Sequence, residues 1–365
     1  MINKMKANLN LGSIAGIHIK IHWTFVLLFA WIVFSEMKRG NSTEHIFYHI
    51  TLIIAVFICV LLHELGHALM AKKYNISTKK ITLLPIGGIA SLEKMPENPK
   101  EEFLVSLAGP FVNFLIAIVL YFCIPVKEFL DKYLLDNAFL MSELNIQSFL
   151  FYLFFINVGL MLFNLIPAFP MDGGRILRAL LTLKTNRVKA TYIASLIGQF
   201  FAVIFLLIGL VYNPFLIFIA LFIFVGAFTE NKIIQQLNLI KGHTVKEAMM
   251  TNITTFNPSD SIDKVIDAIL KGTEKDFVVV LNSKVVGIIL HNDIIENSSN
   301  RNCLVKDIMK VAFKSLKSND DLKLYYEFIQ TNSTFFLPVI DNSELVGVLD
   351  INNLNEYLLI QAKLT

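Results

Sequence analysis

Long apolar runs dominate the first two-thirds of this 365-residue sequence and constrain its fold more than any other feature. From about residue 20 to residue 230, the chain repeatedly stays apolar for close to the ~20 residues that a helix needs to cross a bilayer. The mean hydropathy is +0.60. Only 17% of the residues are charged, against about 25% in an average soluble domain. These features exclude a disordered chain and an ordinary soluble enzyme.

Six segments of this region are predicted to span the membrane as helices, and the first and last are the shortest. The chain starts with polar residues and shows no small-residue cleavage site. We therefore interpret the first segment as a retained span rather than a removed signal peptide. The predicted spans are residues 21–34, 46–71, 103–123, 147–164, 192–211 and 214–228.

Basic residues are unevenly distributed among the loops that join these spans. If the N-terminus lies in the cytosol, the cytosolic segments hold fourteen Lys and Arg residues and the outside loops hold four. Because cytosolic loops carry the excess of basic residues, this count predicts a multi-pass protein of the cell membrane with both termini in the cytosol. The net charge of +3 is too small, in a chain of this length, to indicate a nucleic-acid partner.

One ionisable motif interrupts the second apolar run: His63-Glu64-Leu65-Gly66-His67. Residues four apart share one face of a helix, so His63 and His67 can bind one metal ion. Glu64 lies beside this pair, where it can act as a general base toward water. This is the HExxH arrangement of zinc hydrolases. The alternative is a polar cluster that joins helices by packing, but ionisable groups are costly inside a membrane and are rarely idle there.

A zinc hydrolase needs a third protein ligand and leaves the fourth position to water. Asp172 is the candidate, because it follows Pro167 and Pro170 at the end of the fourth span and precedes two glycines. A helix broken in this way is tolerated at membrane depth where it lines a protein cavity. The predicted topology places Asp172 and the histidine pair at the cytosolic ends of their spans. Taken alone, however, the segment is also typical of a plain turn.

Two further histidine pairs have the same spacing but lack the following Glu. His18 and His22 lie in an alternating segment that is typical of a strand or a membrane-entry segment, so they need not face one metal ion. His45 and His49 lie at the outside end of the second span. We interpret both pairs as interfacial residues.

Together these residues resemble the site-2 protease family of intramembrane zinc metalloproteases (peptidase family M50), over roughly residues 10–230. Besides the HExxH motif, residues 164–174 match the family's Asn-x-x-Pro-x-x-Pro-x-Asp-Gly-Gly segment. Residues 84–88 resemble its glycine-bearing membrane-associated loop, and residues 108–113 resemble the start of its third core span. The layout is most similar to the branch with cytosolic CBS domains, which includes the sporulation protease that processes pro-sigma-K.

The resemblance implies one zinc ion per chain, bound by His63, His67 and Asp172, with Glu64 as the general base. It also implies substrate-positioning roles for Asn164, Asn113, Gly87 and Gly88. The implied substrate is a membrane-bound precursor or regulator, such as a pro-sigma factor, an anti-sigma factor or a remnant signal peptide, cleaved within or near its transmembrane segment. A transmembrane helix hides its carbonyl groups in hydrogen bonds. We therefore expect local unwinding, with strand addition along residues 81–92.

The composition changes near residues 231–242, after which the charge density is that of a soluble protein. Residues 245–296 and 305–358 repeat with a period of about 60. Each repeat is predicted as strand–helix–strand–strand–helix, and the pair resembles tandem CBS domains, which can bind adenosine nucleotides. We therefore predict an all-α polytopic membrane domain at residues 1–235, with its zinc site near the cytosolic side. An α+β pair of cytosolic CBS domains is predicted at residues 242–365.

The tail departs from the nucleotide-binding pattern of this module. Members that bind a ribose often carry Thr, and Asp three residues later, after the glycine-bearing strand. The first repeat has Leu290 and Asp293 there, and the second has Asp350 and Asn353. Only Asp293 matches, so it is the candidate contact for an adenosine nucleotide. The pattern as a whole favours a dimerisation or docking module, compatible with a homodimer, over a nucleotide-binding one.

A membrane transporter or channel regulated by CBS domains is the alternative function. It accounts for the spans and the tail, but gives no reason for Glu64 inside the zinc motif or for Asp172 at matching depth. A catalytically idle protein of the same fold would be expected to have lost Glu64 or a ligand, and neither is missing. The sequence therefore predicts an intramembrane zinc metalloprotease regulated through cytosolic CBS domains.

Overall fold

The protein forms two compact units, Met1–Lys232 and Ile233–Thr365. The structure is a computed structural model, and it describes residues 8–85, 87–92, 95–135, 144–301, 303–331 and 335–364. Helix α9 (Phe215–Ile240) contains the boundary between the two units.

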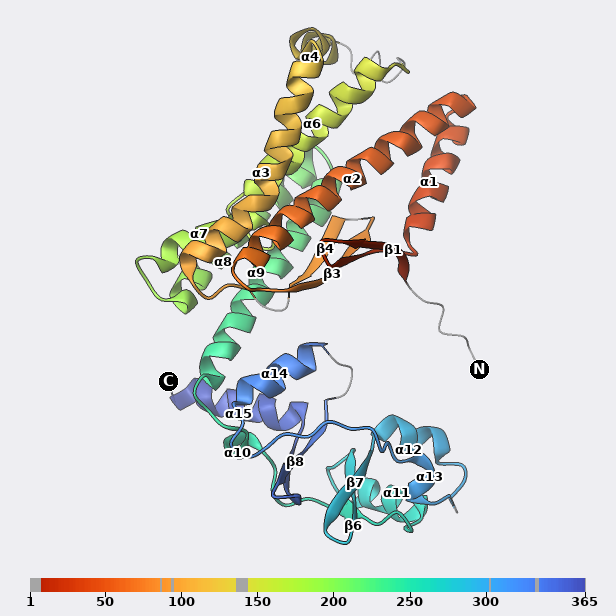
Figure 1. Ribbon diagram of the computed structural model, residues 1–365, viewed down its shortest axis with the longest axis vertical. Coiled ribbons are helices and arrows are strands. Elements are labelled where there is room, and N and C mark those ends of the chain that lie inside the picture. The colour runs from red at the N-terminus through yellow and green to blue at the C-terminus, as the bar shows by residue number, and fades with distance from the viewer. Residues whose placement is uncertain are drawn as a thin grey trace. The chain divides into compact units, whose positions relative to one another are not determined.

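The first unit is mostly helical and carries one small sheet (Figure 1). Its other helices are α1 (Phe25–Lys38), α2 (Thr43–Lys73), α3 (Pro99–Cys123), α4 (Val126–Leu135), α6 (Ile146–Leu165), α7 (Asp172–Thr182) and α8 (Arg187–Val211). Its strands are β1 (Asn8–Ile14), β2 (Ile17–His22), β3 (Thr78–Leu84) and β4 (Gly87–Leu92). The helical character agrees with the predicted class of this region, and the sheet is an addition to it.

Five of the described helices are long and apolar enough to cross a membrane, namely α2, α3, α6, α8 and α9. They correspond to the last five predicted spans. The first predicted span, residues 21–34, begins too early, because Ile21 and His22 belong to β2. The helix that follows, α1, has only 14 residues. At 1.5 Å per residue it is about 21 Å long, which is shorter than the ~30 Å hydrocarbon core.

Many large apolar side chains of these helices point outward, as a lipid-facing surface requires. On α8 and α9 they include Phe200, Leu207, Leu210, Val211, Phe215, Phe218 and Leu221, each more than half exposed. In water such apolar faces would cause aggregation, whereas in a bilayer they are covered by lipid tails, which are equally apolar.

The small sheet packs beside the part of α2 that carries the HExxH motif. Its strand order is β1-β2-β3-β4, with β2 and β3 parallel and the two outer pairs antiparallel. The alternation of Ile17–His22 correctly predicted a strand: Ile17 and Ile19 are buried and His18 is exposed. Ile81 and Leu83 of β3 pack in one buried cluster with Leu65 and Ala68 of α2. This packing leaves β4 as an edge strand beside the motif.

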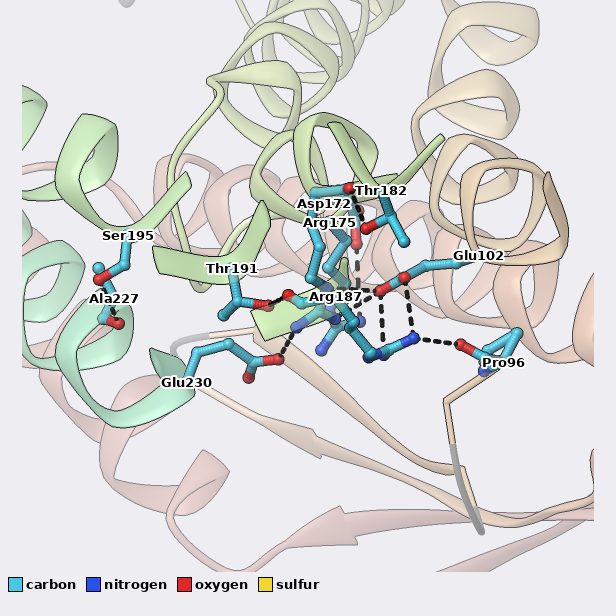
Figure 2. A network of polar contacts seen from close by, with 11 residues as sticks. Pro96, Glu102, Asp172, Arg175, Thr182, Arg187, Thr191, Ser195, Ala227 and Glu230 are labelled. Carbon is cyan, nitrogen blue, oxygen red and sulfur yellow. Dashed lines mark hydrogen bonds and ion pairs between the residues drawn. The ribbon is translucent and has the colours of Figure 1, made fainter. Parts of the chain in front are cut away.

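A network of buried charges joins α3, α7, α8 and α9 (Figure 2). Arg178 of α7 is fully buried and donates from Nε (2.8 Å) and Nη2 (2.5 Å) to Oε1 of Glu102 on α3, while Nη1 donates to Glu230 on α9. Arg187 of α8 pairs with the other Glu102 oxygen at 3.3 Å. Burial lowers the pKa of Arg178, but the carboxylates of Glu102 and Glu230 raise that pKa by more. Arg178 is therefore charged, and the network is neutral overall.

The second unit contains two repeats of one motif, as the periodicity predicted. The first comprises α10 (Val245–Ala248), β5 (Thr255–Phe256), α11 (Ile262–Lys271), β6 (Phe277–Leu281), β7 (Lys284–Ile289) and α12 (His291–Asn297). The second comprises α13 (Val305–Ile308), α14 (Leu322–Thr331), β8 (Leu337–Asp341), β9 (Glu344–Leu349) and α15 (Ile351–Leu364).

The two repeats exchange backbone hydrogen bonds symmetrically. Met250 of the first repeat pairs in both directions with Val348 of the second, at 2.8 and 2.9 Å. Lys310 of the second repeat pairs in the same way with Ile288 of the first, at 2.8 and 3.1 Å. Each repeat thus extends the hairpin of the other, so the pair folds as a single unit.

Candidate metal centre

Three side chains that are far apart in the sequence converge beside α2. Nε2 of His63 and Nε2 of His67 are 3.1 Å apart. Oδ2 of Asp172 lies 3.3 Å from the first of these nitrogens and 3.1 Å from the second. All three side chains are buried. Within the described part of the chain they are the group of His, Cys, Asp and Glu residues that could hold a metal ion, with ligand atoms within 4.8 Å of one another.

The segment between α6 and α7 delivers Asp172 to the histidine pair. Pro167 and Pro170 cannot donate backbone hydrogen bonds, so the helix of the fourth predicted span ends at Leu165. Met171 is extended and caps α7, which makes Asp172 the first residue of that helix. A carboxylate at a helix N-terminus is favoured by the helix dipole. The predicted broken helix therefore exists, and it places Asp172 opposite His63 and His67.

The second ring nitrogen of each histidine is bound to an acceptor on α3. Nδ1 of His67 lies 2.7 Å from the carbonyl oxygen of Val105, and Nδ1 of His63 lies 2.5 Å from Oδ1 of Asn113. Both Nδ1 atoms must therefore carry a proton, and in the neutral rings both Nε2 atoms are then acceptors. In that state, two imidazole lone pairs and one carboxylate oxygen face one another without a donor. A cation satisfies such a group, and this nitrogen and oxygen donor set suits zinc.

A cavity of about 520 Å³ opens beside the three residues. Glu64 lines it without belonging to the ligand group. The backbone of Gly88 on the edge strand β4 lies directly against Glu64, since a Cβ atom at Gly88 would be 2.6 Å from its Cγ. Gly87 and Asn164 line the same cavity. An acidic side chain, an edge strand and the candidate metal site therefore share one space.

Asn113 and Asn164 lie differently in the site, although both were predicted to position substrate. Asn164 is partly buried and donates from Nδ2 to the carbonyl of Leu160 at 3.0 Å. Asn113 is fully buried, and both ends of its amide are engaged, by His63 and by Asn157. The sequence analysis missed Asn157. The signal that could have found it is an amide in the interior of an apolar run.

The remaining candidate residues lie away from the metal group. Nδ1 of His22 lies 2.8 Å from Oγ1 of Thr24, and Nδ1 of His49 lies 3.5 Å from Oε2 of Glu36. In the second unit, Asp293 pairs with Nζ of Lys310 at 2.9 Å.

Arg175 approaches the oxygen of Asp172 that faces away from the histidines, at 4.0 Å (Figure 2). It thereby adds a positive charge at the rim of the site.

Comparison with known proteins finds relatives of both parts of the chain. The model of peptidase family M50 matches residues 51–208, and the CBS domain model matches residues 245–300. A zinc metalloprotease of Methanocaldococcus jannaschii is 36% identical over 346 residues, covering 94% of each chain. Stage IV sporulation protein FB of Bacillus subtilis is 31% identical over 47% of this chain and 51% of its own. The solved site-2 protease from Methanocaldococcus jannaschii is 40% identical, with a TM-score of 0.44 over 61% of this chain and 95% of its own.

Proposed function

Since this chain belongs to the site-2 protease family of zinc metalloproteases (peptidase family M50), we propose that it cleaves a membrane-bound precursor or regulator within or near its transmembrane segment. The observation that carries the proposal is the convergence of His63, His67 and Asp172 on a cavity that Glu64 also lines. A pro-sigma factor, an anti-sigma factor or a remnant signal peptide would offer such a substrate, a peptide bond within or near a membrane-bound segment.

The chain's own residues divide the work between holding the metal and moving a proton. His63, His67 and Asp172 would hold the zinc ion as its three protein ligands. When bound, zinc would act as a Lewis acid that lowers the pKa of water to about 7 and polarises the scissile carbonyl. Glu64 accepts the proton of the attacking water and then donates it to the leaving amine. The transporter alternative gives Glu64 no such role.

The substrate must reach this site in an extended form, because the carbonyl groups of an intact helix are already hydrogen-bonded. Strand β4 is the edge of the sheet, and its Gly88 lies against Glu64. A substrate strand added to β4 would run past the general base with one side of its backbone hydrogen-bonded to β4. The absence of side chains at Gly87 and Gly88 allows that approach, and Asn164, which lines the same cavity, can bind a substrate carbonyl.

The surroundings of the site follow from the sequence. The excess of basic residues favours a multi-pass protein of the cell membrane with the N-terminus, the zinc site and the tail on the cytosolic side. The CBS pair is then positioned to regulate cleavage from the cytosol, as a docking or homodimerisation module. Asp293 is already paired with Lys310, so a nucleotide that contacts Asp293 would have to compete with this ion pair.

The test compares zinc content and cleavage in the same preparations. Parent protein, His67→Ala and Glu64→Gln are purified in detergent, and zinc per chain is measured with cleavage of a model pro-sigma transmembrane substrate. We expect one zinc per chain in the parent and in Glu64→Gln, less zinc in His67→Ala, and cleavage only by the parent. A parent protein without zinc would make the HExxH motif a packing cluster and overturn the proposal.

A further inference from the structure

A chain of amide hydrogen bonds runs from the backbone of α6 to a candidate metal ligand on α2. Nδ2 of Asn157 donates to the carbonyl oxygen of Leu153 at 2.8 Å. Oδ1 of Asn157 accepts from Nδ2 of Asn113 at 2.9 Å, and Oδ1 of Asn113 lies 2.5 Å from Nδ1 of His63. Asn157 and Asn113 are both fully buried. This series of hydrogen bonds therefore links three helices, α6, α3 and α2, through two fully buried amides.

The two amide side chains can be oriented in only one way if every hydrogen bond of this series is to have one donor and one acceptor. The carbonyl of Leu153 can only accept, so the NH₂ group of Asn157 must face it. The oxygen of Asn157 then faces Asn113, whose own NH₂ group must point back toward it. The oxygen of Asn113 is thereby presented to His63, whose Nδ1 must donate. The backbone of α6 thus fixes which nitrogen of His63 carries the proton.

We propose that Asn157 is a positioning residue for the metal site, which acts through Asn113 to hold His63 in the tautomer and orientation that bind zinc. If the amide of Asn113 were reversed, its NH₂ group would face Nδ1 of His63. The ring proton would then sit on Nε2, where it blocks the lone pair that faces Asp172. The inference rests on the proposed function, since it takes His63 as a zinc ligand.

We call the hydrogen bonds from Asn157 through Asn113 to His63 the relay. A comparison with His67 shows why only His63 needs it. Val105, Gly109 and Asn113 lie four residues apart and so share one face of α3. Val105 offers its backbone carbonyl to His67 directly at 2.7 Å. Opposite His63 the same face offers a side-chain amide, which can bind in either direction unless a neighbour fixes it. Asn157 is that neighbour, and its burial in an apolar helix is costly without such a partner.

The thiol of Cys59, one turn before His63 on α2, also lies beside the side chain of Asn157. A thiol is only a weak donor and acceptor, so it does not compete with the carbonyl of Leu153 for the direction of the amide. Cys59 thus packs against the relay, and the structure assigns it no place in the metal group.

The relay is tested by a double-mutant cycle read out as zinc affinity. Parent, Asn157→Leu, Asn113→Ala and the double variant are purified in detergent, and the zinc Kd is measured by chelator competition. We expect each single substitution to weaken zinc binding by about 10–100-fold. Because Asn157 acts through Asn113, the double variant should be no weaker than Asn113→Ala alone. Independent effects that multiply would overturn the proposal, and so would an unchanged Kd in folded Asn157→Leu.

Two companion variants separate positioning from general damage. Ser195→Ala removes a buried hydrogen bond to the carbonyl of Ala227 (2.8 Å), which involves no member of the metal group (Figure 2), and should leave the zinc Kd unchanged. Asn157→Asp keeps the shape, and a buried protonated carboxyl can donate to Leu153 and accept from Asn113. It should bind zinc within about threefold of the parent, less weakened than the 10–100-fold expected for losing the relay. An equal loss in Asn157→Asp and Asn157→Leu would contradict the relay, whereas a parent without zinc would instead contradict the proposed function.

Discussion

Gly109 of α3 leaves no room for a side chain beside His67. A Cβ atom at Gly109 would lie 2.2 Å from Nε2 of His67 and 2.6 Å from Nε2 of His63. Real Cβ atoms do not approach so closely, so the backbone of α3 itself forms one wall of the metal site. The spacing of α2 and α3 therefore depends on this position having no side chain.

We expect Gly109→Ala to displace both imidazole rings by close to an ångström. Because misplacement on this scale costs about 100-fold in rate, cleavage should fall at least that far, together with zinc content. The matched control is Gly159→Ala, on a neighbouring membrane helix, where a Cβ atom meets nothing within 4 Å. That variant should keep its zinc and its rate. Zinc per chain and initial cleavage rates are the measurements, and a parental zinc content in Gly109→Ala would contradict the argument.

Gly88→Ala should separate proton transfer from metal binding. Its new Cβ atom would lie 2.6 Å from Cγ of Glu64, which is too near the backbone of α2 to move freely. We expect kcat to fall by about 10²–10⁴-fold, the usual contribution of a general acid–base, while zinc content stays at the parental level. Zinc loss comparable to that of His67→Ala would mean that Gly88 supports the ligands rather than Glu64.

The edge of β4 offers a test of substrate binding by strand addition. Successive residues of a strand direct their N–H groups to opposite sides, so Ile89→Pro and Ala90→Pro remove one N–H that faces β3 and one that faces outward. The variant that loses the outward N–H should fold and bind zinc normally but cleave the model substrate at least about tenfold more slowly, the loss expected for one unmade hydrogen bond to the substrate. Thermal unfolding identifies the variant that damages the sheet. Parental cleavage by both variants would exclude strand addition at β4.

The sequence was most informative where one short segment carries the chemistry. The HExxH spacing predicted the shared face of His63 and His67, and the two prolines predicted the broken helix that presents Asp172. The sequence could not predict which α3 residues would contact the histidines, because these contacts depend on the register between two apolar helices. Asn157 was missed for the same reason. The first span was predicted to begin too early because hydropathy does not distinguish the end of strand β2 from the start of a membrane helix.

The pairing of Arg178 with Glu102 was also beyond the sequence, since 76 residues separate them. Their burial allows a sharp prediction about stability. Among the described residues, Arg178→Met leaves Glu102, which is 1% exposed, paired with the partly exposed Arg187 alone. Breaking a buried ion pair by removing one partner costs about 3–5 kcal/mol, so the free energy of unfolding in detergent should fall by up to about that amount.

The double variant Arg178→Met with Glu102→Gln should recover part of this loss, because it removes the stranded charge as well. The control is Lys264→Met, which breaks a pair with Asp260 on the surface of the second unit. Such exposed pairs contribute about 0–1 kcal/mol. Denaturant titration of the four proteins measures these differences. If Arg178→Met unfolded no more easily than Lys264→Met, the charge network would not hold α7 in place, and the position of Asp172 would have to depend on the proline segment alone.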